Sequence, residues 1–157
     1  MKRPFYITLL CIFLLGCGGK IENKKIGLYV DKKGLKPETL TVFNNQQLKE
    51  NKNVSFGDQL TIEVNGIDDF KMISKTHCLP GAEYAVADEN GDLVYLTKDL
   101  FTKYASNGVN IEDAKSLKLN LTIGKPMEVG KKYFFLFRIW DKNSDKELKG
   151  NLELNVL

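Results

Sequence analysis

Apolar and polar residues alternate along several short stretches of the chain, and this period of two constrains the fold more than any other feature. The clearest stretch, residues 117–123, has an apolar residue at every second position: Leu117, Leu119, Leu121 and Ile123. Successive side chains of a β-strand point to opposite faces, so the pattern predicts strands with one face on a core and the other in water. No strand–helix–strand spacing accompanies it, which favours an all-β, antiparallel protein.

Similar stretches recur between turns rich in Gly, Asn and Asp. The predicted strands are residues 26–31, 39–43, 60–64, 70–73, 84–87, 93–96, 117–123, 133–140 and 148–156. Gly91 is expected to take a positive φ in the hairpin turn between two of them. A short helix is predicted over residues 97–104 with Thr97 as its cap, and one further helical turn over 110–114. The predicted fold is therefore an antiparallel β-sandwich of about 7–9 strands with one short helix.

The N-terminus differs from the rest of the chain. Met1-Lys2-Arg3 is a short basic start, residues 5–15 form an apolar run broken only by Thr8, and Gly16-Cys17 follows. Eleven residues at ~1.5 Å each are too short to span a hydrocarbon core of ~30 Å. The run is therefore predicted to be the apolar region of a signal peptide and not a stable anchor.

Leu14-Leu15-Gly16-Cys17 resembles the lipobox of bacterial lipoproteins. In that family the cysteine thiol is diacylated and the chain is cut just before the cysteine, so the resemblance implies a signal peptide over residues 1–16 and lipidation of Cys17. Two acyl chains give stable anchoring, and the body would be tethered to the membrane. Gly18 after the cysteine, by analogy with sorting in enteric bacteria, implies an outer-membrane location in the cell envelope. An uncleaved apolar N-terminus and an ordinary secretory signal are the alternatives.

The remaining residues divide into two parts. Residues 17–25, which are Cys17 and the polar, glycine-started stretch after it, are predicted to be a lipidated, flexible tether, and residues 26–157 a single β-sandwich domain. Of the 23 basic residues, Lys2 and Arg3 lie in the predicted signal peptide, and the others nearly balance the 20 acidic residues. A near-neutral body does not indicate a nucleic-acid-binding protein.

Cysteine and metal chemistry are not expected. Cys78 is the one cysteine of the body beyond Cys17, which leaves no intramolecular disulfide partner. The adjacent His77 is the only histidine, and the two side chains would point to opposite faces of an extended segment. We predict an inert thiol there. Residues 141–147 have oxygen side chains at alternate positions, as the start of a calcium loop does, but Lys146 stands in place of its Gly and Leu152 in place of its final Glu, which favours a polar hairpin turn.

An enzyme is also not expected. The chain contains no G-x-S-x-G motif, P-loop or dinucleotide fingerprint. The adjacent carboxylates Asp68 and Asp69 have no placed partner, so they do not define a general acid and base. Accordingly, neither a cofactor nor a metal is predicted.

Residues 115–157 look like the last strands of an immunoglobulin-like domain. In that family a tyrosine near the start of the penultimate strand anchors the preceding corner through its hydroxyl, and Tyr133 occupies the matching place. The cysteine pair of antibody domains is absent, so the resemblance implies the sandwich architecture alone.

The strand predicted over residues 133–140 is apolar on both faces. Its second face carries an aliphatic, a cationic and two aromatic side chains: Phe134, Leu136, Arg138 and Trp140. A strand of a two-sheet sandwich needs only one apolar face. Either a loop, the short helix or the N-terminal segment covers the second face, or it is a surface for a partner, since Trp and Arg are favoured interface anchors.

Two functional hypotheses follow. The first is a non-catalytic, membrane-tethered lipoprotein that acts as a protein-interaction or assembly module in the cell envelope and has a protein partner there. The alternative is a lipoprotein that binds a glycan or small molecule, with Trp140 or Phe134 as the stacking platform. The two differ in whether the aromatic face is flat or concave, and the periplasmic and surface-exposed orientations are both open.

Overall fold

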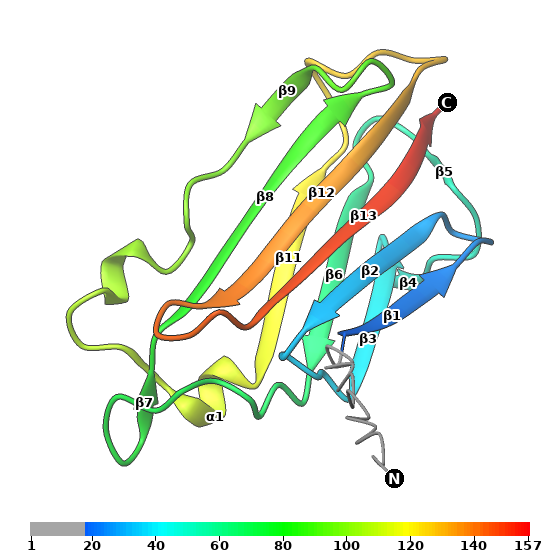
Figure 1. The fold of residues 1–157 in the computed structure, drawn as a ribbon. Coiled ribbons are helices and arrows are strands. Elements are labelled where there is room, and N and C mark those ends of the chain that lie inside the picture. Colours follow the sequence, from blue (N-terminus) through cyan, green and yellow to red (C-terminus); the bar gives the residue numbers. More distant parts are fainter. Residues whose placement is uncertain (1–17) are drawn as a thin grey trace, which may run out of the picture.

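The computed structural model describes residues 18–157 as two facing, mainly antiparallel sheets (Figure 1). The larger sheet contains, in spatial order, β1 (Gly18–Asn23), β2 (Leu28–Lys33), β13 (Glu147–Val156), β12 (Lys132–Asp141), β8 (Pro80–Asp88) and β9 (Leu93–Leu96). A seventh strand, β5 (Asn53–Val54), pairs with β13 in parallel. The smaller sheet contains β11 (Ser116–Thr122), β6 (Gln59–Asn65), β3 (Thr39–Asn44) and β4 (Gln47–Leu48).

Four short elements lie at one end of the sandwich. β7 (His77–Cys78) pairs with β10 (Val109–Asn110), outside both sheets. The 3₁₀ helix η1 (Thr102–Tyr104) and the helix α1 (Ile111–Ala114) are the two helical pieces within residues 18–157. No helix in this part of the chain has the length and apolar composition needed to cross a membrane.

The predicted fold class is confirmed. Nine strands have four or more residues, in line with the expected number, and the others are two-residue pieces. In the smaller sheet β6 lies between β3 and β11, and in the larger sheet β12 lies between β8 and β13. This is the A-B-E sheet facing the C-F-G sheet of an immunoglobulin-like sandwich, which β1 and β2 extend beyond β13.

The core fills the space between the two sheets. β6 contributes Leu60, Ile62 and Val64, all with no solvent exposure, in strict alternation with polar residues. From the larger sheet Phe135 and Ile139 are equally buried. The period of two in the sequence therefore arises because each sheet buries only the face that it turns toward the other.

Tyr133 forms the expected tyrosine corner. Its side chain is 2% exposed, and its hydroxyl oxygen accepts a hydrogen bond of 2.9 Å from the backbone N–H of Glu128. The bond holds the turn that enters β12 against the start of that strand. The role that the immunoglobulin-like resemblance implied for Tyr133 is thus present in the geometry.

The helix predicted over residues 97–104 is wrong for its first five residues. The backbone N–H of Thr97 donates to the carbonyl of Tyr84 at 2.8 Å, and that of Leu100 donates to Ala82 at 2.8 Å. The segment therefore continues along β8, because these cross-strand bonds take the N–H groups that a helix would need. The helical turn predicted over residues 110–114 is confirmed as α1, with the Asn110 side chain accepting from the backbone N–H of Glu112.

Two further corrections concern weakly patterned segments. Gly18–Asn23, expected to belong to a flexible tether over residues 17–25, forms β1 and pairs along its whole length with β2. Ile21 lies opposite Val30 and packs against the core, which explains the order of this polar segment. The strand predicted over residues 70–73 reduces to a single bridge at Met72. The predicted signal peptide, residues 1–16, and Cys17 lie outside the described residues.

Tyr133→Phe removes the corner hydrogen bond and leaves the Glu128 N–H without its acceptor. We expect the free energy of unfolding to fall by about 1–2 kcal/mol. Urea denaturation followed by the fluorescence of Trp140, the only tryptophan, measures this. Tyr104→Phe, at a tyrosine that is 38% exposed, is the matched control and should change stability little. Equal effects in both variants would contradict a stabilising corner bond.

Candidate functional site: the outer face of the larger sheet

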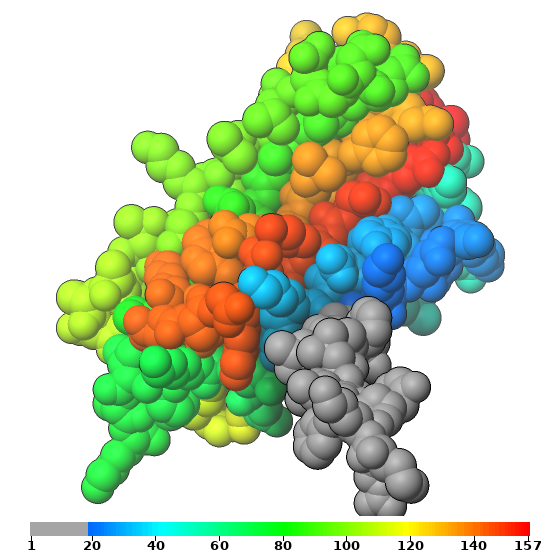
Figure 2. Space-filling model, viewed as in Figure 1, coloured from blue at the N-terminus to red at the C-terminus, as the bar shows by residue number. Residues whose placement is uncertain are grey.

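The four side chains singled out in the sequence lie together on one face. Phe134, Leu136, Arg138 and Trp140 alternate with buried residues along β12 and are each partly exposed. They point away from the smaller sheet, so they belong to the outer face of the larger one. No element of residues 18–157 crosses this part of the face (Figure 1), and in Figure 2 the strands of the larger sheet run side by side across the surface. Within these residues, neither a loop nor a helix covers the second face of β12.

Neighbouring strands extend the apolar surface. In β8, Ala85 pairs with Leu136 and Ala87 with Phe134. β9 continues the rows, since Leu96 pairs with Ala85 and Leu93 with Ala87. We call the resulting set the apolar patch, which consists of Leu93, Leu96, Ala85, Ala87, Phe134 and Leu136. Leu93 and Leu96 are 58% and 62% exposed, so the patch is open to solvent at the β9 edge.

A β-bulge creates the outermost part of the patch. Leu93 and Leu96 are three residues apart, and in a regular strand they would point to opposite faces. The register of the β8–β9 pair shifts between Val86 and Ala87, which places both leucines opposite outward-facing alanines. Alternation along the sequence could not assign them to one face, which explains why the sequence analysis missed them.

The apolar patch is slightly hollowed. A depression of about 290 Å³ lies over Ala85, with Leu96, Leu136 and Arg138 around it. It forms because alanine stands between taller side chains on β9 and β12. The face is therefore neither fully flat nor a deep pocket.

An ion-pair network borders the depression. Arg138 Nε donates to Glu147 Oε2 at 2.9 Å, and its Nη1 lies 3.7 Å from Glu83 Oε1. Lys149 Nζ lies 2.8 Å from the other oxygen of Glu147. The hydrogen bond from Lys149, together with Arg138, lowers the pKa of Glu147, although partial burial opposes the shift. Glu147 therefore stays ionised at neutral pH and holds Arg138 against the sheet.

Trp140 is already engaged within the protein. The guanidinium carbon of Arg138 lies 4.6 Å from the centre of the indole ring. The ring also occupies the space beside Gly81, where any β-carbon would clash with it. One face of the indole is thus covered by Arg138, which reduces its value as a stacking platform for a sugar.

Beyond β12 the outer face becomes charged. The register of β13, β2 and β1 places acidic and basic side chains in alternating positions: Glu147, Lys149, Glu153, Asp31, Lys33, Lys20 and Glu22. Apart from Glu83 and Arg138 of the ion-pair network, the outer face is thus mainly apolar on β8, β9 and β12 and mainly charged on β13, β2 and β1.

Cys78 and His77 do not form a reactive pair. Cys78 has no solvent exposure, and its Sγ lies 3.8 Å from the carbonyl oxygen of Val109. Burial, with a smaller contribution from the charge of Asp141, raises the pKa of the thiol to about 11. The ring nitrogen Nδ1 of His77 lies 2.9 Å from the Thr76 hydroxyl. The thiol is therefore protonated at neutral pH and shielded from solvent.

The carboxylates of two acidic turns, the calcium-loop candidate at residues 141–147 and the hairpin turn after β8, are engaged by the turns themselves. Asp141 accepts hydrogen bonds from the Asn143 N–H at 2.9 Å and the Ser144 hydroxyl at 2.7 Å. Asp88 accepts from the N–H groups of Asn90 and Asp92, both at 2.9 Å. Both segments are polar hairpin turns. Among residues 18–157 no group of three His, Cys, Asp or Glu side chains is placed to hold a metal ion.

Comparison with known proteins adds no relative to this description. No protein-family model matches the chain, and no curated protein matches it in sequence. The arguments for function therefore rest on the geometry of this chain.

The buried Cys78 thiol should react slowly. In a pulse of N-ethylmaleimide at neutral pH, we expect the peptide containing Cys78 to be modified at least about a hundredfold more slowly in the native protein than in guanidinium chloride. Peptide mass spectrometry measures the modified fraction. Rapid native labelling would show that the thiol is accessible and would reopen a reactive role.

Proposed function

We propose that this protein is a lipid-anchored, non-catalytic interaction module of the bacterial cell envelope, and that a partner protein docks on the apolar patch. The observation that carries the proposal is the uncovered apolar half of the outer face. The side chains of Phe134 and Leu136 lie on the outer face and do not contribute to the core between the sheets. Leu93 and Leu96 extend this apolar surface to the exposed β9 edge. Contiguous exposed apolar surface on a soluble domain marks an interaction site.

The surroundings of the patch indicate the chemistry of the partner. A protein surface with an apolar ridge would fill the depression over Ala85 and bury Leu96 and Leu136. Glu83, Arg138 and Lys149 lie at the rim of that depression and would select complementary charges. An apolar centre with a charged rim is the usual arrangement of a protein–protein interface.

The lipobox residues Leu14–Cys17 support a membrane anchor, with the outer membrane as the proposed location. β1 begins at Gly18, directly after Cys17, so a lipid on that cysteine would hold the β1 edge of the sheet close to the bilayer. β9 is five strands away, roughly 24 Å at ~4.8 Å per strand. The open edge of the apolar patch would then face away from the membrane, toward a partner.

The alternative of a glycan or small-molecule site on this same face has less support. Its stacking platform was to be Trp140 or Phe134, and Arg138 already covers one face of the Trp140 indole. The depression beside them is shallow and mainly apolar in its lining. Aliphatic side chains and alanines suit a protein surface better than a hydroxylated ligand.

Site-specific photo-crosslinking tests the docking face. The benzophenone amino acid p-benzoylphenylalanine replaces Leu96 in one variant and Leu48 in another, and the full-length proteins are irradiated in intact envelopes. The two leucines are 62% and 65% exposed, but Leu48 lies on β4 of the smaller sheet. We expect a discrete protein adduct from position 96 and none of that size from position 48.

Leu136→Glu combined with the crosslinker at position 96 should abolish that adduct, because a carboxylate would be desolvated in the interface. Circular dichroism checks that the variant is folded. Absence of any adduct at position 96, or the same adduct from position 48, would refute docking on the apolar patch.

The lipid anchor is tested by substitution of single cysteines. We expect metabolic labelling with an alkyne fatty acid to modify the wild-type protein and Cys11→Ser, and to be lost in Cys17→Ser. The labelled proteins should partition into the detergent phase, and the unlabelled Cys17→Ser variant should partition into the aqueous phase. Cys11 is the matched control because it lies in the same N-terminal segment, within the apolar run. Labelling that persists in Cys17→Ser would contradict the lipoprotein assignment.

A further inference from the structure

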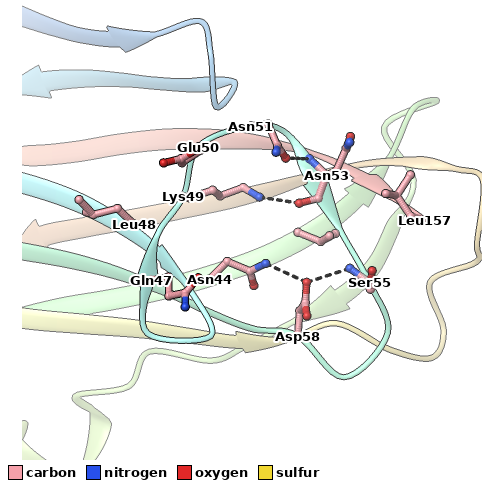
Figure 3. A pocket seen from close by; sticks show the side chains of 11 residues that line it. Asn44, Gln47, Leu48, Lys49, Glu50, Asn51, Asn53, Ser55, Asp58 and Leu157 are labelled. Carbon is pink, nitrogen blue, oxygen red and sulfur yellow. Dashed lines mark hydrogen bonds between the residues drawn. The ribbon is translucent and has the colours of Figure 1, made fainter.

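A polar pocket lies between the edge strand β4 of the smaller sheet and β5, which pairs with β13 of the larger sheet (Figure 3). Its volume of about 530 Å³ falls within the range of ~300–1,000 Å³ that is usual for small-ligand sites. The lining is mostly amide and charged side chains: Asn44, Gln47, Lys49, Glu50, Asn51, Asn53 and Asp58. It lies at the opposite edge of the smaller sheet from β11.

Asp58 holds the side chains and backbone of one pocket wall together through hydrogen bonds. Its Oδ2 accepts hydrogen bonds from Asn44 Nδ2 at 2.8 Å and from the Ser55 N–H at 2.9 Å, and its Oδ1 accepts from Asn45 Nδ2 at 2.7 Å. Burial alone would raise the pKa of this carboxyl, but these hydrogen bonds outweigh it and lower the pKa. The carboxylate is therefore ionised and engaged with the protein, so it orients Asn44 and is not itself a free ligand.

Asn44 presents a buried acceptor without a donor. Its Nδ2 donates to Asp58 Oδ2. Exchanging N and O of the Asn44 amide would place its carbonyl oxygen against that carboxylate oxygen, and both are acceptors, so the orientation of the amide is fixed. Its Oδ1 is buried and has no hydrogen-bond partner within residues 18–157. A buried carbonyl left unpaired is costly, so a donor from outside the chain would stabilise it.

Lys49 presents a buried donor in the same pocket. The residue is only 8% exposed, and its Nζ donates to the backbone carbonyl of Asn53 at 2.9 Å. That is its one hydrogen bond within the described part of the chain, whereas an ammonium has three N–H groups to donate. Burial lowers the pKa of Lys49, and the charge of Asp58 partly opposes this.

We propose that this pocket binds a neutral saccharide. Separate sugar hydroxyls can donate to Asn44 Oδ1 and accept from Lys49 Nζ, which would give each of these buried groups a further partner. An anion is disfavoured because Glu50 and Asp58 together outweigh the charge of Lys49. A cation would find the Asp58 oxygens already bonded. Val54, which is 2% exposed and also lines the pocket, offers an apolar contact for the C–H face of the ring.

The saccharide site is independent of the docking face. The apolar patch lies on β8, β9 and β12, whereas the pocket is formed by β4, β5 and the segments that flank them. A glycan could occupy the pocket while a partner protein is docked, and failure of either proposal would leave the other untouched.

A glycan array of neutral and acidic saccharides tests the proposal, with the full-length protein and its variants presented in detergent micelles. Lys49→Met keeps the aliphatic stem and removes the donor, and Lys24→Met is the matched control at a lysine whose side chain is 85% exposed. Ser55→Trp fills the pocket from a position that bonds to Asp58 through backbone atoms alone, so it leaves Lys49 and Asn44 in place.

We expect the wild-type protein and Lys24→Met to bind a subset of neutral glycans with equal affinity. Lys49→Met and Ser55→Trp should each bind that subset about tenfold more weakly or not at all. If Lys49→Met fails to fold, Ser55→Trp still tests whether the glycan binds in this pocket. No binding of any neutral glycan, preference for acidic glycans, or binding that survives in Ser55→Trp would overturn the proposal.

Discussion

The structure depends on the position of β12 in the middle of the larger sheet. Both hydrogen-bonding edges of this strand are occupied, by β8 on one side and β13 on the other. Its inward side chains, such as Phe135 and Ile139, have no solvent exposure because they meet the smaller sheet. Its outward side chains have no second layer among the described residues, although two of them are large and apolar. A two-sheet sandwich accounts for one apolar face of its central strand, and the other face needs a different explanation.

The surroundings of β12 turn that excess of apolar residues into a defined surface. The small alanines of β8 lie between two rows of larger side chains, Phe134 and Leu136 on β12 and the two leucines on β9. The bulge in the β8–β9 pair directs both leucines outward. On the other side, the Glu147 network holds Arg138 along the sheet and against Trp140. The outer face therefore changes from apolar to charged within one strand. Such a boundary would give the proposed partner both an apolar centre and a fixed register.

The two proposed sites use opposite physical chemistry. On the apolar patch, a docked partner would remove aliphatic surface from water and would have to present a complementary protein surface. The pocket beside β5 contains a carbonyl without a donor and an ammonium with a single acceptor, both withdrawn from water, so it would favour a small ligand with paired donors and acceptors. The first site lies on the face of a sheet and the second where the edges of the two sheets approach, so one small domain can carry both.

The sequence by itself determined the all-β class, most of the strands and the tyrosine corner, because a period of two and one well-placed hydroxyl are local signals. It also placed Phe134, Leu136, Arg138 and Trp140 on one face. Tertiary structure decided the rest. Residues 97–101 follow β8 because long-range hydrogen bonds outweigh local helix propensity, and Gly18–Asn23 is ordered by pairing with β2. Leu93 and Leu96 share a face only through a bulge, and Lys49 reaches the carbonyl of Asn53 only where β4 and β5 approach. Such pairings join residues that no local pattern connects, so they exist only once the chain has folded.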